Sequence, residues 1–420
     1  MLTAKARTVI VADSILSPDL TDYLHRRGMF CWVTAKNGEV EAVANAVFCG
    51  VDGIVMADTS AAWNYLEQFR DYPTVRMKPT VVAHRGVSHN GKYLENSLKS
   101  VAAAVDMGVY FIEADLTMTA DGQLIVFHDD TIDRLLLGSG SVSDYTLDEL
   151  KKIPMRADVS ERVMSADEFI EAVIKLYPEI DIVFSLELKD RFSEKSFYAV
   201  QELMQKNPQY YERTIINDYV TRDKVRETLG NIGIRGHMDG EVLPTGWDNN
   251  AELANILITT RRENIWWTRL THGVPWYSFD QIHDSLFPQM YARSVPLLVG
   301  WQDDPQTIMH DILNGIPIFT GNVPCIESFI WGIDSSDIYI NDASDVDVSV
   351  QVEAFSYKSL NATPDGFYVL SEENDCKLYY EGGKLHASGS GCVVIQWYID
   401  CFYNNEQYRV YSLPIRVVVQ

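Results

Sequence analysis

The stretch Val109-Tyr110-Phe111-Ile112-Glu113-Ala114-Asp115 decides the fold, because a run of alternating side chains ends here in two carboxylates. Such alternation predicts a β-strand whose odd-numbered residues share one face. Similar short apolar runs recur on both sides of this stretch, separated by amphipathic segments. The runs are Val81–Ala83, Tyr110–Ala114, Leu124–Phe127, Ile182–Leu188, Thr214–Ile216, Ile232–Ile234, Ile265–Trp267, Leu297–Val299 and Ile316–Phe319.

Strands that alternate with helices indicate an α/β fold with a parallel sheet. About eight such units over roughly 250 residues predict a closed (β/α)8 TIM barrel, which we place at residues 79–332. The active sites of such barrels lie at the C-terminal ends of the strands. Polar residues at those positions are therefore the candidates for chemistry.

Two further regions flank the predicted barrel. Residues 1–78 repeat the strand-and-helix rhythm three times, with apolar runs at Val9–Val11, Cys31–Val33 and Ile54–Met56. Three units cannot close a barrel, so we interpret them as a partial βα repeat resembling the tail of an upstream barrel, and an ordinary N-terminal extension is the alternative. Residues 333–420 show strand signals broken by turns and no helix signal, which predicts a small β-sandwich (Ig-like) module.

Composition restricts the partners. The 420-residue chain is 46% hydrophobic and carries a formal net charge of -24. A strongly acidic chain does not dock onto nucleic acid or an anionic membrane, since both require clustered Lys and Arg. No apolar run approaches the roughly 18 to 20 residues that cross a bilayer, so we expect a soluble protein without stable membrane insertion. The six cysteines form no C-x-x-C pair, and both a disulfide near the C-terminus and buried free thiols stay open.

Histidines follow two of the predicted strands. Val81-Val82-Ala83 is followed by His84-Arg85-Gly86, and Leu124–Phe127 is followed by His128. Two histidines at neighbouring strand ends could serve as a general acid and a general base. Taken alone, a histidine at the end of a strand is more often a structural hydrogen-bonding residue than a catalytic one.

Carboxylates lie on the predicted inner faces of two strands. Glu113 and Asp115 share a face with Phe111, while Glu187 and Lys189 lie opposite the apolar side chains of their strand. Two inward carboxylates repel each other and favour a cation, and their oxygen atoms suit Mg²⁺ or Ca²⁺. The alternatives are a solvated strand end for the first pair and a buried structural ion pair for the second.

The ordered set of these motifs resembles the glycerophosphodiester phosphodiesterase family over about residues 80–328. The matching elements are His84-Arg85-Gly86, Glu95-Asn96-Ser97, Glu113-Ala114-Asp115, Thr119-Ala120-Asp121-Gly122, His128-Asp129 and Glu187-Leu188-Lys189. Two positions depart from the family pattern. Leu94 stands where the family usually has proline, and Thr320-Gly321-Asn322-Val323-Pro324 lacks the family's late acidic residue.

The resemblance implies metal-dependent hydrolysis of small-molecule glycerophosphodiesters to glycerol 3-phosphate and an alcohol. It implies one divalent cation, Mg²⁺ or Ca²⁺, held by Glu113, Asp115 and Glu187. His84 and His128 would be the acid and base, Arg85 and Lys189 would bind the phosphate, and Glu95 would add a metal or substrate contact. Residues 130–153 would form an insertion over the substrate.

Two other functions are compatible with the same residues. One is a catalytically inactive surface-binding protein on a degenerate barrel, and another is a related phospholipase-type phosphodiesterase. The aromatic residues Trp266, Trp267, Trp276 and Tyr277 could shape an alcohol pocket or serve in packing. A tandem barrel with a β-module favours a secreted or cell-surface bacterial protein, while the oligomeric state is not readable from the sequence.

Overall fold

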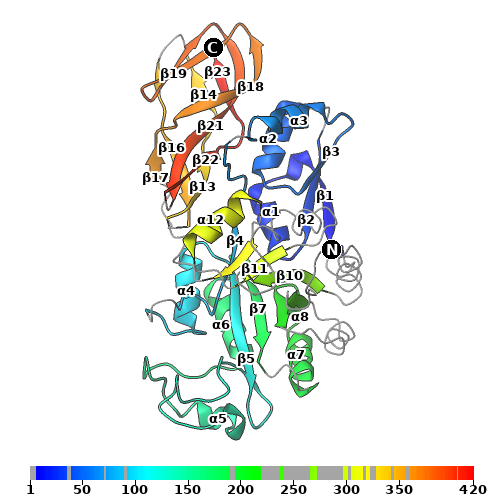
Figure 1. Cartoon of the computed structure of the whole chain (residues 1–420), viewed down its shortest axis with the longest axis vertical. Helices are drawn as coiled ribbons and strands as arrows, with labels where there is room; N and C mark the ends of the chain where they lie inside the picture. The colour runs from blue at the N-terminus through cyan, green and yellow to red at the C-terminus, as the bar shows by residue number, and fades with distance from the viewer. Residues whose placement is uncertain are drawn as a thin grey trace.

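The computed structural model (Figure 1) describes most of the chain. The described residues are 6–35, 39–70, 72–88, 92–189, 194–218, 236–239, 265–271, 297–300, 304–315, 318–321, 328–341, 345–355, 360–403 and 405–420. An N-terminal βα unit and a C-terminal β-region lie at one end of the molecule, and a central α/β unit extends away from them (Figure 1).

The central sheet closes into a parallel barrel. Of the nine strands in this sheet, β6 pairs only with β5, and the other eight form a ring because β4 pairs with both β12 and β5. In ring order the strands are β4 (Thr80–Ala83), β5 (Phe111–Met118), β7 (Val183–Leu188), β8 (Thr214–Asp218), β9 (Gly236–Asp239), β10 (Ile265–Thr271), β11 (Leu297–Gly300) and β12 (Ile318–Gly321). The predicted TIM barrel is confirmed.

One predicted barrel strand has another direction in the structure. The segment Leu124–Phe127 is not a parallel barrel strand: β6 (Leu124–Val126) runs antiparallel to the end of β5. The physical reason is the turn at Asp121-Gly122, where Gly122 has φ of 75° and its N–H donates to the carbonyl of Thr119, so the chain folds back as a hairpin. The predicted strand Ile232–Ile234 lies outside the described residues.

Alternation along the strands separates the barrel interior from its outer wall. Val82, Phe111, Val183 and Ile215 belong to one buried cluster. Their neighbours in sequence, such as Ile112 and Phe184, belong to the cluster that packs against the helices. Along β5 and β7, Glu113 pairs in register with Ser185 and Asp115 pairs with Glu187. An apolar inner layer is thus followed, toward the strand C-termini, by an ionic one.

Helices formed by the amphipathic segments between the strands cover the outer wall of the barrel. Ser97 and Ser165 cap α4 (Leu98–Asp106) and α6 (Ala166–Leu176), each through a reciprocal capping box. Phe169 of α6 packs edge-on against Phe184 of β7 with ring centroids 6.4 Å apart. The other helices in the described part of the barrel are α7 (Glu194–Lys206), α8 (Pro208–Tyr211) and α12 (Pro305–Leu313).

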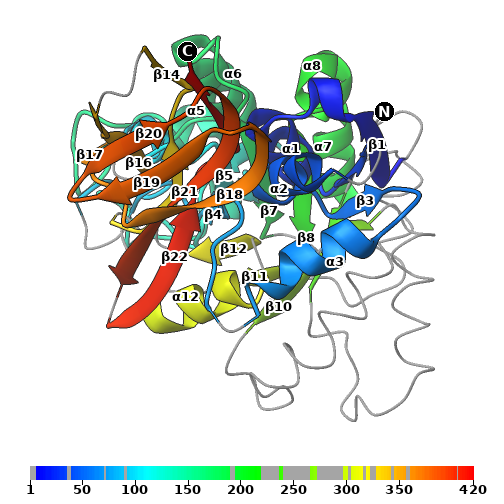
Figure 2. The same cartoon turned by 90° about the horizontal axis from the view of Figure 1, so that it is seen from above.

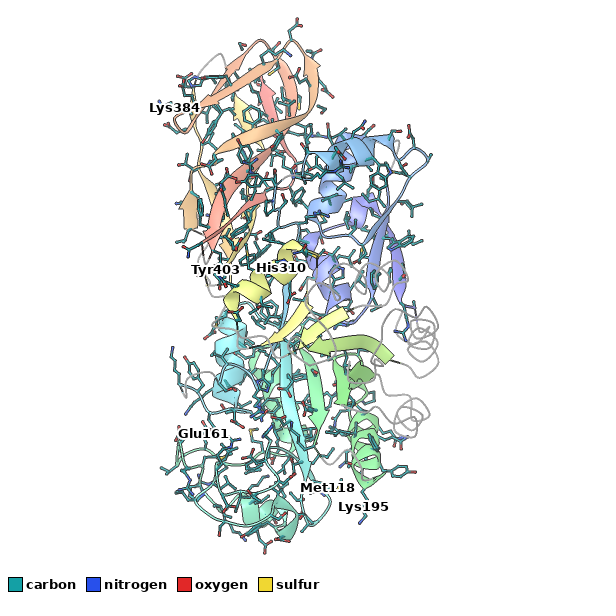
Figure 3. All side chains as sticks on the ribbon, viewed as in Figure 1. Met118, Glu161, Lys195, His310, Lys384 and Tyr403 are labelled. Carbon is teal, nitrogen blue, oxygen red and sulfur yellow. The ribbon has the colours of Figure 1, made fainter. Side chains whose placement is uncertain are left out.

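An insertion follows β6 at the far end of the barrel. It contains η4 (Val142–Asp144) and α5 (Leu147–Leu150) and has its own apolar core, which includes Ile132, Leu136 and Leu150. Figure 3 shows Met118 at the end of β5 and Glu161 of the insertion at the opposite end of the molecule from Lys384 in the C-terminal region. The insertion therefore lies at the end of the barrel where the strands terminate.

The N-terminal unit is a three-stranded parallel sheet with helices. Its elements are β1 (Thr8–Ala12), η2 (Asp13–Ile15), α1 (Pro18–His25), β2 (Phe30–Thr34), α2 (Val40–Phe48), β3 (Gly53–Val55) and α3 (Ser60–Glu67). Leu24 and Met29 share a buried cluster with Phe111 and Val183, the first residues of β5 and β7. The unit thus covers the N-terminal end of the barrel.

A buried ion pair ties this unit to the barrel. Arg27 is 1% exposed, and its guanidinium donates two hydrogen bonds of 2.7 Å to the two carboxylate oxygens of Asp181, just before β7. It also stacks on Tyr23, 3.8 Å from the ring centroid. Arg26 pairs with the same carboxylate at 3.3 Å. Burial would raise the pKa of Asp181, but Arg27 and Arg26 outweigh it and hold that pKa below its usual value.

The C-terminal region is built from strands in three sheets. They are β13-β16-β17, β14-β23-β21-β18 with β22 on β21, and β15-β20-β19. The bounds are β13 (Ile330–Asp334), β14 (Ile338–Ile340), β15 (Val346–Asp347), β16 (Val350–Ala354), β17 (Leu360–Ala362), β18 (Gly366–Asn374), β19 (Lys377–Glu381), β20 (Lys384–Ser388), β21 (Gly391–Tyr403), β22 (Glu406–Tyr411) and β23 (Ile415–Val419).

Trp397 is the centre of this β-region. Its ring is fully buried between Phe367 of β18 and Tyr380 of β19, with centroid distances of 5.5 and 5.2 Å. Two of the sheets therefore share one core. The predicted domain boundary at residues 332 and 333 falls inside β13, which already pairs with β16.

The N-terminal unit also packs against the β-region, as seen from above in Figure 2. Tyr65 of α3 donates a 2.6 Å hydrogen bond to Gln396, and Phe48 and Phe69 pack on Tyr411. The five described cysteines are free. Within the described part of the chain, no helix has the length and apolarity needed to cross a membrane.

We expect Asp181→Ala to lower the free energy of unfolding by about 3 kcal/mol, because it leaves the buried Arg27 guanidinium without its carboxylate partner. The measurement is urea denaturation followed by circular dichroism. Glu179→Ala, two residues away on an exposed side chain, is the matched control and should change stability by less than about 0.5 kcal/mol. Equal effects of the two substitutions would contradict this anchoring role.

Candidate metal centre

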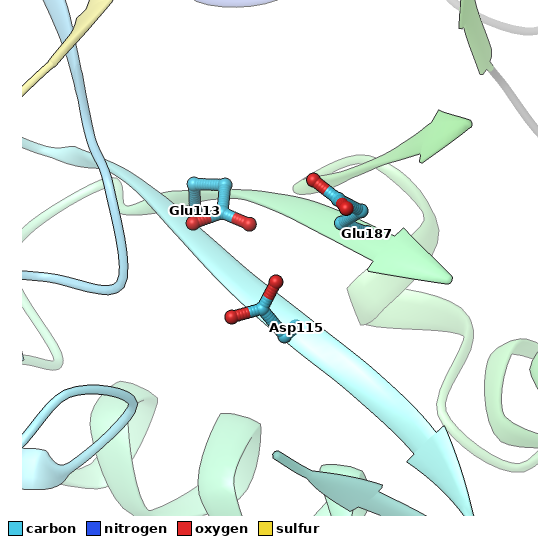
Figure 4. Close-up of side chains that lie close together, drawn as sticks. All are labelled: Glu113, Asp115 and Glu187. Carbon is cyan, nitrogen blue, oxygen red and sulfur yellow. The ribbon is translucent and has the colours of Figure 1, made fainter. Parts of the chain in front are cut away.

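Three carboxylates meet inside the barrel, near the ends of β5 and β7. Glu113, Asp115 and Glu187 each offer an oxygen atom within 4.8 Å of the other two, and their exposures are 1%, 0% and 1%. Figure 4 shows the three side chains pointing toward one another from the two adjacent strands. The structure therefore brings together the three residues predicted as metal ligands.

Burial and mutual repulsion dominate the electrostatics of this triad. Desolvation, followed by the charges of Asp115 and Glu187, raises the pKa of Glu113 well above its ordinary value. Burial would also raise the pKa of Asp115, but Lys189, Arg85 and a hydrogen bond from Asn96 reverse the sign and lower it. Of these two carboxylates, Glu113 is therefore the one whose negative charge is less well compensated by neighbouring cations and hydrogen bonds.

Two side-chain cations partly balance the triad. Lys189 lies 2.9 Å from Asp115 and also pairs with Glu187, and the Nε atom of Arg85 lies 3.1 Å from Asp115. When all three carboxylates are ionised, they exceed these two cations by one negative charge. A buried excess charge is costly unless a further cation is present.

The donor set fits a hard divalent cation. The Oε1 atom of Glu113 is buried and accepts no hydrogen bond from any described residue. All three groups are carboxylates, which suit Mg²⁺ or Ca²⁺ rather than the softer metals. Glu113, Asp115 and Glu187 would hold such an ion.

Arg85 links the triad to the first barrel loop. Its backbone has φ of 55°, an uncommon conformation for a residue with a side chain, and its N–H donates a 2.8 Å hydrogen bond to Glu113. Its guanidinium pairs through Nη1 with Glu95 at 3.1 Å and through Nε with Asp115. The predicted phosphate-binding residue is therefore held by two carboxylates and by its own backbone.

Asn96 is a site residue that the sequence analysis did not single out. Its Nδ2 donates to Asp115 at 2.8 Å, and the N–H of Asp115 donates to its Oδ1 at 3.2 Å. Its backbone has φ of 56°, a conformation that asparagine tolerates better than most residues. The signal available in the sequence was the Glu95-Asn96 pair itself.

The two histidines follow strands of different kinds. His84 follows β4, and its N–H donates to the carbonyl of Gly321 at 3.3 Å. His128 follows β6, so the expectation that both histidines end parallel barrel strands is wrong for this one. The hairpin returns the chain across β5 instead, because the N–H of Phe127 donates to the carbonyl of Asp115 at 3.0 Å.

Asp129 and Arg134 form a second group of charges beside the triad. Asp129 lies 2.6 Å from Nδ1 of His128, and Arg134 contacts both Asp129 and Glu95. The hydrogen bond from Arg134 lowers the pKa of Asp129 to about 2. Sequence reasoning missed Arg134, because nothing local distinguishes it from an ordinary surface arginine of the insertion.

Other predicted positions cannot be placed. The side chains of Trp266 and Trp267 and all of Trp276 and Tyr277 lie outside the described residues, as does the stretch 322–324 of the late motif.

Comparisons with known proteins agree with the motifs. Residues 84–223 match the model of the glycerophosphoryl diester phosphodiesterase family. A glycerophosphodiester phosphodiesterase of Caldanaerobacter subterraneus subsp. tengcongensis is 35% identical over 159 residues, which are 35% of this chain and 62% of that protein. The human glycerophosphodiester phosphodiesterase 1 is 27% identical over 36% of this chain and 47% of its own length.

Among solved structures, an Oleispira antarctica phosphodiesterase in complex with the product sn-glycerol-3-phosphate aligns with a TM-score of 0.47 and 19% identity. The alignment covers 59% of this chain and 94% of that one. The matches to the curated relatives in sequence span 41% to 62% of the first three, less than two thirds of their length.

We expect Mg²⁺ or Ca²⁺ to raise the melting temperature, and Glu113→Gln to remove most of that increase, because the amide keeps the acceptor for the N–H of Arg85 but loses the ligand charge. At a free ion concentration about 100 times Kd, the wild-type gain corresponds to about 2.7 kcal/mol. Without ions, the variant should melt at or above the wild-type temperature, since a buried like charge is gone. The measurement is differential scanning calorimetry with each ion and with EDTA.

Asp148→Asn, on an exposed residue of α5, is the control and should respond to ions as the wild type does. A wild-type protein whose melting temperature ignores both ions would favour the alternative interpretation, a purely structural ionic cluster.

Proposed function

Residues 84–223 belong to the glycerophosphodiester phosphodiesterase family, and from this premise we propose that the chain hydrolyses glycerophosphodiesters to glycerol 3-phosphate and an alcohol. The observation that carries the proposal is the convergence of charge at one end of the barrel. Three buried carboxylates, Arg85, Lys189 and His128 come together there from β5, β7, the loop after β4 and the β5–β6 hairpin.

Phosphate binding falls to Arg85 and Lys189. Guanidinium presents five N–H donors, and the contacts of Arg85 with Asp115 and Glu95 involve Nε and Nη1. Its Nη2 donates no hydrogen bond to a described carboxylate, so it can donate to a phosphate oxygen. A divalent cation bound by the triad would add Lewis-acid neutralisation of the phosphate charge.

Proton transfer falls to His84 and His128. One imidazole accepts the proton of the attacking hydroxyl, which is that of water or of the substrate's glycerol. The other donates a proton to the alcohol oxygen as its bond to phosphorus breaks. This division requires one neutral and one protonated imidazole at the start of the reaction. If the glycerol hydroxyl attacks, the two imidazoles reverse their roles when water opens the cyclic phosphate, which restores both states. If water attacks directly, the two imidazoles end with exchanged protonation states, and proton exchange with solvent restores them.

The rival proposals explain less of the site. An inactive binding protein on a degenerate barrel has no need for three buried carboxylates with uncompensated charge, and phospholipase-type cleavage would use the same residues on a lipid. Export to the cell surface stays a prediction from the domain organisation alone.

We expect purified protein to release glycerol 3-phosphate from glycerophosphocholine or glycerophosphoethanolamine with Mg²⁺ or Ca²⁺ and not with EDTA. His128→Ala and His84→Ala should each lower kcat by about 100-fold or more, because each removes a proton-transfer group. Glu113→Ala should abolish the metal dependence together with most of the activity. Release is measured by a coupled glycerol 3-phosphate dehydrogenase assay.

Asp148→Asn serves again as the control and should retain full activity. The absence of release from these substrates with either metal, in protein that is folded and binds the ion, would contradict the proposal.

A further inference from the structure

We propose that Arg134 of the insertion is a positioning residue, which holds Asp129 against His128 and Glu95 against Arg85 and so orients a proton-transfer group and a phosphate-binding group together. For its effect on turnover the inference rests on the proposed function. The contacts themselves do not depend on it.

The guanidinium of Arg134 bridges two carboxylates. Its Nε and Nη2 donate to the two oxygens of Asp129 at 2.6 and 2.9 Å. Its Nη1 and Nη2 donate to the two oxygens of Glu95 at 2.8 and 2.7 Å. Paired contacts of this kind fix both the distance and the plane of each carboxylate, which a single lysine ammonium could not do.

Asp129 determines which nitrogen of His128 can exchange protons. Its Oδ1 lies 2.6 Å from Nδ1 of the imidazole. An ionised carboxylate has no proton to donate, so Nδ1 must carry the hydrogen of this bond. The other nitrogen, Nε2, is then the one available to a substrate, as in other catalytic histidines that a carboxylate orients.

Glu95 connects Arg134 to Arg85. Its Oε1 accepts a hydrogen bond from Nη2 of Arg134 and another, 3.1 Å long, from Nη1 of Arg85. The opposite edge of Arg85 pairs with Asp115 of the triad. A continuous chain of charge pairs therefore runs from His128 to the predicted metal ligands, and Arg134 is its central link.

The insertion holds Arg134 in place. Ile132 and Leu136, on either side of it, are fully buried in the core of the insertion, and the N–H of Leu136 donates to the carbonyl of Ile132 at 2.8 Å. Arg156 donates to the carbonyl of Leu136 at 2.9 Å. Leu94, next to Glu95, packs against the same core. The insertion thus supports both ends of the bridge.

Removing Arg134 should have two consequences, one for the positions of the carboxylates and one for the charge near His128. Glu95 and Asp129 would lose the cation between them and repel each other, so neither carboxylate would keep its fixed orientation, although Asp129 would stay next to His128 in the chain. Asp129, no longer neutralised, would at the same time attract a protonated His128 more strongly. An Asp129 substitution, in contrast, removes that attraction altogether.

The test compares Arg134→Gln, Arg134→Lys and Asp129→Asn by two measurements on the full chain with its metal ion. One is kcat and KM for glycerophosphocholine, and the other is the titration of His128 by NMR of its imidazole C–H resonances. The resonance is assigned by its loss in His128→Ala. The charged groups of the site that stay unchanged in all three variants are Arg85, Glu95, Asp115, Glu113, Glu187 and Lys189, and of these Asp115 interacts electrostatically with His128.

We expect Arg134→Gln to lower kcat about 10- to 100-fold, the range typical of residues that orient catalytic ligands, with a smaller change in KM. Arg134→Lys should recover only part of the loss, because a lysine lacks the paired donors. The titration of His128 should move up in Arg134→Gln and down in Asp129→Asn. A purely structural contribution would not displace it in opposite directions.

The matched control is Arg162→Gln, another arginine of the insertion, whose Nη1 donates, among the described residues, to the carbonyls of Val159 and Glu161. It should leave turnover and the titration unchanged. An unaltered titration in Arg134→Gln and Asp129→Asn, or full activity in Arg134→Lys, would overturn the proposal. A wild-type protein that releases no glycerol 3-phosphate would overturn the proposed function instead, and the titration would still decide whether the network exists.

Discussion

The repulsion among Glu113, Asp115 and Glu187 is the constraint on which the rest of the site depends. Strand alternation turns all three carboxylates into the barrel, where water cannot screen them. Their neighbours are arranged accordingly. Lys189 and Arg85 supply charge, Asn96 and the N–H of Arg85 supply hydrogen bonds, and the remaining negative charge suits a divalent ion. The left-handed backbone of Arg85 is tolerated because it brings that N–H to Glu113.

The contacts that stabilise the barrel through the N-terminal unit and the carboxylates of the candidate site lie at opposite ends of the barrel. The N-terminal unit covers the end where the strands begin, through the apolar cluster around Phe111 and the pair of Arg27 with Asp181. The same unit contacts the C-terminal β-region through Tyr65 and Phe48. The β-region is therefore joined to the enzyme-like barrel on the side away from the carboxylates.

The β5–β6 hairpin and the insertion convert a general barrel into a specific site. A parallel strand after β5 would carry its C-terminal histidine to the next position round the ring. The turn at Gly122 instead returns the chain over Asp115 and places Asp129 and Arg134 beside Glu95. Two parts of the chain that a simple barrel would keep apart, the first barrel loop and the insertion, are linked by charge in this way.

Most of the architecture and the triad could be read from the sequence. Period-two alternation determines which side of a strand each residue faces, so Glu113, Asp115, Glu187 and Lys189 could be assigned to the barrel interior without a structure. The recurrence of strands and helices likewise determined the parallel barrel and the N-terminal βα unit. These inferences depend on the spacing of residues that are close together in the sequence, which can be seen without a structure.

Only the tertiary structure decided the direction of β6, the clamp that Asn96 makes on Asp115, and the bridge from Arg134 to Glu95 and Asp129. A strand of apolar residues has the same sequence pattern whether its partner strand is parallel or antiparallel. A polar side chain in a loop gives no sign of which distant carboxylate it will meet. These features depend on contacts between residues 5 to 39 positions apart in the sequence, and those contacts exist only once loops have been placed by the folding of everything between them.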